Sequence, residues 1–124
     1  KNSKVVIMGL TFKENCPDIR NSKVEDIIKR LKEYEIKPLV VDPWADKEES
    51  LDEYGVELTD INDVHDADCV IMAVAHKEFK SLGLDGVIKL FSNKLAADEK
   101  VFLDVKGIYT VDELENSGMK YWRL

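Results

Sequence analysis

The sequence has few residues that bind metals or form disulfides: two cysteines, Cys16 and Cys69, and two histidines, His65 and His76. The cysteines are far apart and form no CxxC pair, which argues against a zinc site and against a disulfide framework. We therefore expect no bound metal and a reducing, cytoplasmic setting.

Long hydrophobic runs are also absent. The longest covers roughly half of a bilayer span, and no signal-peptide segment follows the first residues. The excess of 25 Asp and Glu over 18 Lys and Arg gives a net charge of -7, which repels nucleic acid and anionic lipid. We expect neither as a partner, and an anionic ligand would need a few locally placed cations. Because the sequence starts almost directly on a predicted strand without a methionine, we expect a piece of a longer protein.

Phosphate-binding glycine motifs are missing as well. Neither GxGxxG nor GxxxxGK[ST] occurs, so an independent dinucleotide-binding or P-loop domain is disfavoured. A signalling receiver is a second alternative with a similar strand order. It needs an acidic cluster after the first strand and a phosphoacceptor Asp after the third, and residues 9–10 and 58–59 supply neither.

What is present indicates one α/β domain. The 124 residues, 44% of them hydrophobic, are enough for a single core. Short apolar runs alternate with helical periodicity, as in βαβ units. We predict strands at 4–8, 39–41, 56–58, 69–74, 101–105 and 120–123, and helices at 23–34, 47–54, around 79, 85–91 and 111–116. This pattern predicts a Rossmann-like, three-layer α/β/α domain, spanning residues 1–124, with a mostly parallel sheet of about six strands.

Two local signals set element boundaries. Ser22, with Glu25 three residues later, matches a capping box at the start of the first helix. Asp42-Pro43 reads as a turn that ends the second strand, because proline cannot donate to a ladder.

The loop at residues 9–22 is the best candidate for a ligand site. Ligands of open α/β sheets bind beyond the carboxyl ends of the strands, and this loop is longer than usual. Phe12 beside Lys13 suits a nucleotide, since the ring can pack on a base or sugar while the ammonium meets a phosphate. Arg20, just before a helix N-terminus, offers a fork for a diphosphate.

A plainer interpretation of the same cations stays open: Lys13 and Arg20 are solvated charges paired with Glu14 and Asp18. For His76, which follows a buried strand, contact with a substrate or a domain surface competes with capping of the next helix. Trp44 and Trp122 are more typical of packing than of ligand contact.

The sequence motifs resemble the C-terminal domain of the UDP-glucose/GDP-mannose dehydrogenase family, and most closely the branch that oxidises UDP-N-acetylhexosamines. The resemblance covers the whole chain, and the loop at 9–22 is its most specific part. The matching segments are GLTFKENCPDIRNS at 9–22, DPW at 42–44, YGV at 54–56, AVAHKEF at 73–79, DVKG at 104–107 and YWRL at 121–124.

The resemblance implies a domain of a three-domain enzyme of surface polysaccharide biosynthesis. An N-terminal domain would bind NAD, a central helical domain would support a dimer, and this domain would bind the nucleotide of a UDP-sugar. Phe12, Lys13 and Lys106 would contact the UDP-sugar, and Arg20 would reach the NAD. At the position of Lys106 some branches have Arg, whose bidentate contact an ammonium does not reproduce.

The family oxidises the sugar C6 alcohol to a carboxylate in two NAD-dependent steps, through a thiohemiacetal on a cysteine of another domain. Cys16 is therefore expected to pack rather than to react. The resemblance leaves the identity of the N-acetylhexosamine open. We also expect Asp104 to pair with Lys106, and Leu10 and Phe79 to be exposed where the other domains would dock.

Overall fold

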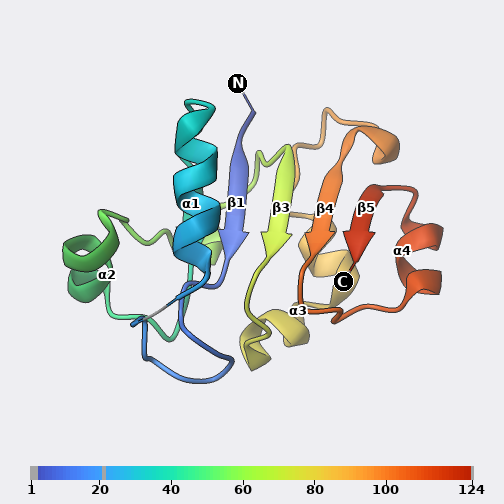
Figure 1. Cartoon of the computed structure of the whole chain (residues 1–124). Coiled ribbons are helices and arrows are strands. Elements are labelled where there is room, and N and C mark those ends of the chain that lie inside the picture. The colour runs from blue at the N-terminus through green and yellow to red at the C-terminus, as the bar shows by residue number, and fades with distance from the viewer. Residues whose placement is uncertain (1–2, 21, 124) are drawn as a thin grey trace.

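The computed structural model describes residues 3–20 and 22–123 and contains a five-stranded sheet in the order β2-β1-β3-β4-β5 (Figure 1). All four neighbouring pairs are parallel. The strands are β1 (Val5–Met8), β2 (Leu39–Val41), β3 (Cys69–Met72), β4 (Val101–Asp104) and β5 (Lys120–Arg123). The predicted α/β class is confirmed. The parts of the predicted loop and closing motif at Asn21 and Leu124 lie outside the described residues.

The sheet has five strands in the described residues because the predicted strand at 56–58 does not form. Only one isolated parallel bridge, Val40 to Leu58, joins this segment to β2. The N–H of Val56 donates to the carbonyl of Ser50 and so belongs to the end of the preceding helix. Too few residues remain to make a ladder.

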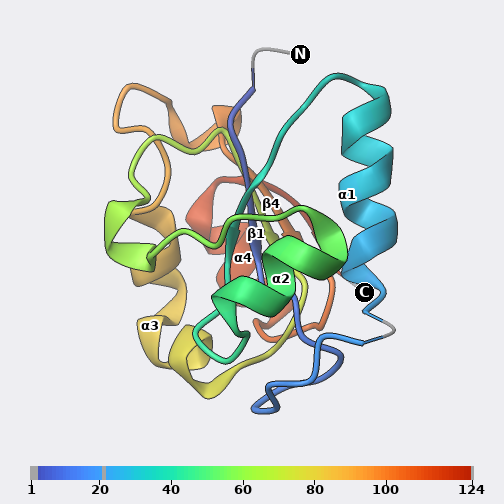
Figure 2. The same cartoon turned by 90° about the vertical axis from the view of Figure 1, so that its left-hand side faces the viewer.

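Helices cover both faces of the sheet. They are α1 (Val24–Glu33), α2 (Lys47–Tyr54), α3 (Lys77–Ile88) and α4 (Val111–Ser117), with short 3-10 helices at Ile61–Asp63 and Ala97–Glu99. Figure 2 shows α1 and α3 on opposite sides of the sheet, with α2 beside its β2 edge. The predicted three layers are thus present.

Two helix predictions need correction. The capping box at α1 does not form: the N-cap residue is Lys23, in helical conformation and without a side-chain cap. Ser22 lies one residue too early, and its hydroxyl accepts instead from the N–H of Val24 at 3.2 Å. The two helical segments predicted near Phe79 and at 85–91 are one element, α3, interrupted at Gly83 with φ 67° and ψ 170°.

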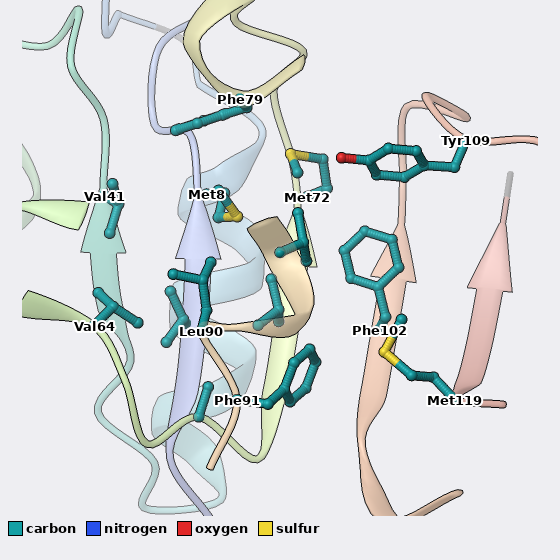
Figure 3. Packing of buried hydrophobic residues seen from close by; sticks show 14 of the residues in the cluster. Met8, Val41, Val64, Met72, Phe79, Leu90, Phe91, Phe102, Tyr109 and Met119 are labelled. Carbon is teal, nitrogen blue, oxygen red and sulfur yellow. The ribbon is translucent and has the colours of Figure 1, made fainter. Parts of the chain in front are cut away.

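Alternate residues of β1 supply the two cores. Val6 and Met8 join the cluster under α3 and α4, which Figure 3 shows, and Val5 and Ile7 join the cluster under α1. All four are buried, as expected for a central parallel strand covered on both faces.

Leu10 and Phe79 are 0% and 1% exposed, so the prediction that they face solvent is wrong. Leu10 continues the α1-side core beyond β1, and Phe79 lies in the α3-side core (Figure 3).

The strand order reverses between β1 and β3. Chain connections leave β1 toward β2 on one side and later return to β3 on the other. In doubly wound sheets this switch point is where ligands bind, outside the carboxyl ends of the strands. The loop at 9–22 and the segment 73–76 both start there.

Candidate functional site

The first loop leaves β1 through Gly9, which has a φ of 110°. Its N–H donates to the carbonyl of Val41 at 2.8 Å. A Cβ at this position would lie 2.5 Å from the Cβ of Val74, so only glycine lets the loop pass close to the end of β3.

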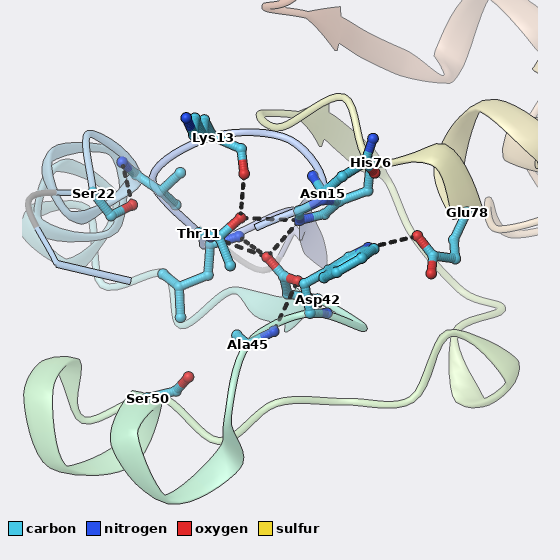
Figure 4. A network of polar contacts seen from close by, with 12 residues as sticks. Thr11, Lys13, Asn15, Ser22, Asp42, Ala45, Ser50, His76 and Glu78 are labelled. Atoms are coloured by element: carbon cyan, nitrogen blue, oxygen red, sulfur yellow. Dashed lines mark hydrogen bonds and ion pairs between the residues drawn. The ribbon is translucent and has the colours of Figure 1, made fainter. Parts of the chain in front are cut away.

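The Asp42 carboxylate binds the backbone at the start of the loop. Its Oδ2 accepts from the N–H groups of Leu10 at 2.6 Å and Thr11 at 3.0 Å. Its Oδ1 accepts from those of Trp44 at 2.8 Å and Ala45 at 3.1 Å. The predicted turn at Asp42-Pro43 is therefore present, but the same carboxylate also binds the loop after β1 (Figure 4).

His76 lies beneath the loop with none of its side chain exposed. Its Nδ1 accepts from the N–H of Asn15 at 2.9 Å. Because a backbone amide can only donate, Nδ1 carries no proton and the ring is in the neutral Nε2–H form. That N–H points to Asp42 Oδ2 at 3.0 Å and Thr11 Oγ1 at 3.1 Å.

The hydroxyl of Thr11 completes this connection, since it donates to the carbonyl of Lys13 at 3.0 Å. Figure 4 shows the contacts from Asp42 through His76 and Thr11 to the backbone of Lys13. We call Thr11, Asn15, Asp42 and His76 the loop-anchoring network. It ties the loops after β1, β2 and β3 together.

Asn15 also caps α3. Its Oδ1 accepts from the N–H of Lys77 at 2.9 Å, and its backbone has a φ of 55°, a left-handed conformation that asparagine tolerates. His76 occupies the N-cap position of α3, but its side chain caps nothing. Of the two interpretations of His76, capping is wrong for the side chain, and its complete burial leaves no domain surface for it to contact.

Trp44 covers the outer side of the network. Its indole ring stacks on His76 with the ring centroids 6.1 Å apart, and Lys77 Nζ lies 5.4 Å from its centroid. Its Nε1–H donates to Glu78 Oε1 at 2.8 Å. Trp44 therefore packs, as the sequence indicated, whereas Trp122 is 51% exposed on β5.

The network stabilises the ionised form of Asp42. Burial alone raises the pKa of this carboxyl, but the hydrogen bonds from His76, Leu10 and Thr11 outweigh burial and hold the pKa below its ordinary value. Asp42 is thus a buried anion that serves as an acceptor for three separate segments.

Phe12 and Lys13 lie on the outside of this anchored loop. Phe12 is 52% exposed although it is a large apolar residue, and Lys13 is exposed as well. The backbone N–H of Phe12 donates to the carbonyl of Asp18 at 2.7 Å, which closes the loop on itself. The exposure of Lys13 agrees with the plainer interpretation, but the described residues contain no ion pair between Lys13 and Glu14.

Arg20 follows the plainer interpretation more closely. Its Nε and Nη2 donate to the two carboxylate oxygens of Asp18 at 3.1 and 3.2 Å. This hydrogen bonding lowers the pKa of Asp18 and raises that of Arg20. The Arg20 side chain is 81% exposed, so one of its faces stays open to solvent.

Lys106 is exposed in the loop after β4, at the same edge of the sheet. Asp104 is not its ion partner: the buried carboxylate accepts from the N–H groups of Ile108 at 3.0 Å and Tyr109 at 2.9 Å. The nearby backbone N–H groups bind the Asp104 carboxylate in preference to the Lys106 ammonium, which water solvates well. Within residues 3–20 and 22–123, no hydrogen bond or ion pair joins Phe12, Lys13, Arg20 and Lys106 to one another.

A cavity of about 310 Å³ opens beside the network, between the 42–47 turn, residues 58–61 and the first turns of α3. Asp42, Lys47, Asp60 and Glu78 contribute its charged lining. None of the four predicted contact residues lines it. The part of the chain that is described holds no cluster of three or more metal-ligating side chains and no helix long and apolar enough to cross a membrane.

Sequence reasoning did not identify the loop-anchoring network as a unit. It interpreted Asp42 as a turn residue and left His76 undecided. The available signal was the position of polar residues directly after three strands that become neighbours in the sheet. Strand order is needed to see that they meet.

The sequence and the fold are similar to those of known proteins. Residues 6–111 match the UDP-glucose/GDP-mannose dehydrogenase family, UDP binding domain. The chain is 44% identical over 111 residues to UDP-N-acetyl-D-glucosamine 6-dehydrogenase of Pseudomonas aeruginosa, covering 90% of this chain and 25% of that protein. It is 37% identical to the Salmonella typhi enzyme of the same name, covering 91% and 25%. The chain thus spans about a quarter of the length of these curated relatives.

A solved structure agrees. NDP-N-acetyl-D-galactosaminuronic acid dehydrogenase from Methanosarcina mazei superposes with a TM-score of 0.78 at 26% identity, over 96% of this chain and 24% of that one. The fold, the family match and the sequence identities agree, and the chain belongs to the UDP-glucose/GDP-mannose dehydrogenase family, as a UDP-binding domain.

Proposed function

We propose that this chain is the C-terminal, UDP-sugar-binding domain of an NAD-dependent nucleotide-sugar 6-dehydrogenase. The parent enzyme oxidises the C6 alcohol of a UDP-N-acetylhexosamine to the uronate. The observation that carries the proposal is the family match over residues 6–111, together with the two relatives named UDP-N-acetyl-D-glucosamine 6-dehydrogenase.

The ligand-facing residues in this proposal are Phe12, Lys13 and Lys106. A half-exposed ring next to an exposed ammonium, both on an anchored loop at the switch point, suits a base or sugar with an attached diphosphate. Lys106 approaches from the loop after β4 as a point charge. With a net charge of -7, the protein depends on such local cations to attract an anion.

Arg20 is the proposed contact to NAD. Its ion pair with Asp18 orients the guanidinium while the side chain stays 81% exposed, so that it can meet an anion held by another domain. The NAD site itself, the reactive cysteine and the dimer contacts belong to parts of the parent outside residues 1–124. Free Cys16 and Cys69 suit a cytoplasmic parent.

Calorimetric titration with UDP and with UDP-N-acetylglucosamine tests this proposal. We expect saturable binding, with a Kd as weak as about 1 mM, equivalent to about -4 kcal/mol. The Lys13→Ala variant should lose it. Lys94→Ala is the matched control, because Lys94 is also exposed but precedes β4 and so lies at the opposite edge of the sheet.

Equal affinity of wild type and Lys13→Ala would contradict the role of Lys13. NADH production by the isolated chain from a UDP-sugar and NAD would contradict the assignment of the oxidation to other domains. Absence of UDP binding, even at tens of millimolar, would count against a nucleotide site on this loop.

A further inference from the structure

The loop that carries Phe12 and Lys13 has no regular secondary structure in its described residues between β1 and α1, yet these two exposed side chains sit on a fixed backbone. Three buried or backbone-directed contacts fix it: Asp42 to the amides of Leu10 and Thr11, Thr11 to the carbonyl of Lys13, and His76 to the amide of Asn15. Phe12 and Lys13 lie between these anchor points.

The burial of the anchors distinguishes them from incidental surface contacts. The side chains of Asp42 and His76 are both 0% exposed, and Thr11 is 1% exposed. Burying an anion and an imidazole is unfavourable unless every polar atom is paired. Here all four ring and carboxylate heteroatoms are paired, and each of them except Oδ1 has at least one partner in the first loop.

The direction of the hydrogen bonds is also determined. The amide of Asn15 requires a lone pair on His76 Nδ1, so Nε2 must donate. The Thr11 hydroxyl gives its proton to Lys13, so it accepts from Nε2. A histidine in the other neutral form, or a protonated one, would leave the amide of Asn15 facing a second donor.

We propose that Asp42 and His76 are positioning residues of the UDP-sugar site, with Thr11 as the link that transmits their placement to Lys13. His76 in its Nε2–H form holds Thr11 and Asn15 on either side of Phe12 and Lys13, and so keeps the ring and the ammonium oriented for a nucleoside diphosphate. Neither Asp42 nor His76 touches the ligand. The ligand assignment rests on the proposed function, whereas the anchoring of the loop does not.

Thr11→Val is the sharpest test because it keeps the branched shape and removes only the hydroxyl. The Asp42–His76 contact remains possible, and the link to Lys13 is lost. We expect amide hydrogen exchange at residues 12–15 to speed up at least tenfold and UDP affinity to fall about three- to tenfold, the effect of one hydrogen bond. His76→Gln keeps an amide nitrogen that can donate as Nε2 does but has no acceptor at the position of Nδ1, and it should speed exchange at Asn15 and Lys77.

Val87→Ala provides the matched control for lost stability. Val87 is 0% exposed in the α3-side core and takes no part in the network. This variant should be less stable than wild type but keep the UDP affinity and the exchange rates of residues 12–15 relative to the rest of the chain.

Nitrogen-15 spectra of the His76 ring give a readout that is independent of the ligand and of stability. Wild type should show an unprotonated Nδ1 and a protonated Nε2. A protonated Nδ1, or unchanged loop exchange in both Thr11→Val and His76→Gln, would overturn the proposal. So would UDP binding that is as tight in these two variants as in wild type. If wild type shows the expected spectra and exchange but binds no UDP, the proposed function fails and the anchoring stands.

Discussion

Gly9 and Val74 approach so closely that a Cβ on Gly9 would lie 2.5 Å from the Cβ of Val74 and 2.9 Å from its backbone nitrogen. The contact joins the start of the candidate ligand loop to the segment that follows β3. Backbone and a β-branched side chain form the obstacle, and neither can rotate away.

Gly9→Ala should therefore destabilise the domain by more than about 2 kcal/mol, since it adds an overlap to a positive φ. Chemical denaturation measures the free energy of unfolding. Gly55→Ala is the matched control: Gly55 has a φ of 67° but nothing within 4 Å of a new Cβ, so its cost is only the backbone term of about 1 kcal/mol. Equal costs at the two positions would contradict the close approach.

Acid should weaken the domain through Asp42. The folded-state pKa of this carboxyl lies below its ordinary value of 3.8, so its stabilising effect is complete above the unfolded pKa and is lost as the pH falls through the folded pKa. Between pH 5 and pH 2 we expect the free energy of unfolding to fall more steeply in wild type than in Asp42→Asn. Carbon-13 titration of Asp42 in the wild type is a second measurement, and a midpoint above 4 would refute the prediction.

Tyr109→Phe should leave stability unchanged or raise it by about 1 kcal/mol. The Tyr109 hydroxyl is buried and has no hydrogen-bond partner within the described residues, and burial raises its pKa to about 12. Removing an unpaired buried group removes its desolvation cost. The control is Tyr54→Phe, because the Tyr54 hydroxyl donates to the carbonyl of Ile19 and its loss should destabilise. A Tyr109→Phe variant less stable by more than 1 kcal/mol would indicate a partner for the hydroxyl.

The sequence predicted the elements whose local signals agree with their surroundings. The helix at Lys47–Tyr54 and the strands Leu39–Val41 and Lys120–Arg123 have the predicted bounds. The strand predicted at 56–58 does not form, because the N–H of Val56 donates to a carbonyl at the end of the preceding helix. The predicted capping box does not form, because the N-cap residue of α1 is Lys23 and not Ser22. Both outcomes depend on backbone geometry that residue types do not report.

The candidate site, like the fold, could be predicted from the sequence only in part. The long loop and its exposed Phe12 and Lys13 were visible as a pattern, since an unusual length and a cation next to a ring are local features. The partners of Asp42 and His76 were not, because they lie 34 residues apart and meet only through the strand order. The ligand-contact roles of Phe12, Lys13, Arg20 and Lys106 stay predictions.

The cap on α3 bears on how the chain folds. Most helices receive their first-turn acceptor from a neighbouring residue and can begin to form alone. Here the acceptor, Asn15, lies 62 residues before Lys77. The start of α3 therefore cannot be completed by local contacts, and the loop and this helix should order together, late and as one cooperative unit, after β1 and β3 have paired.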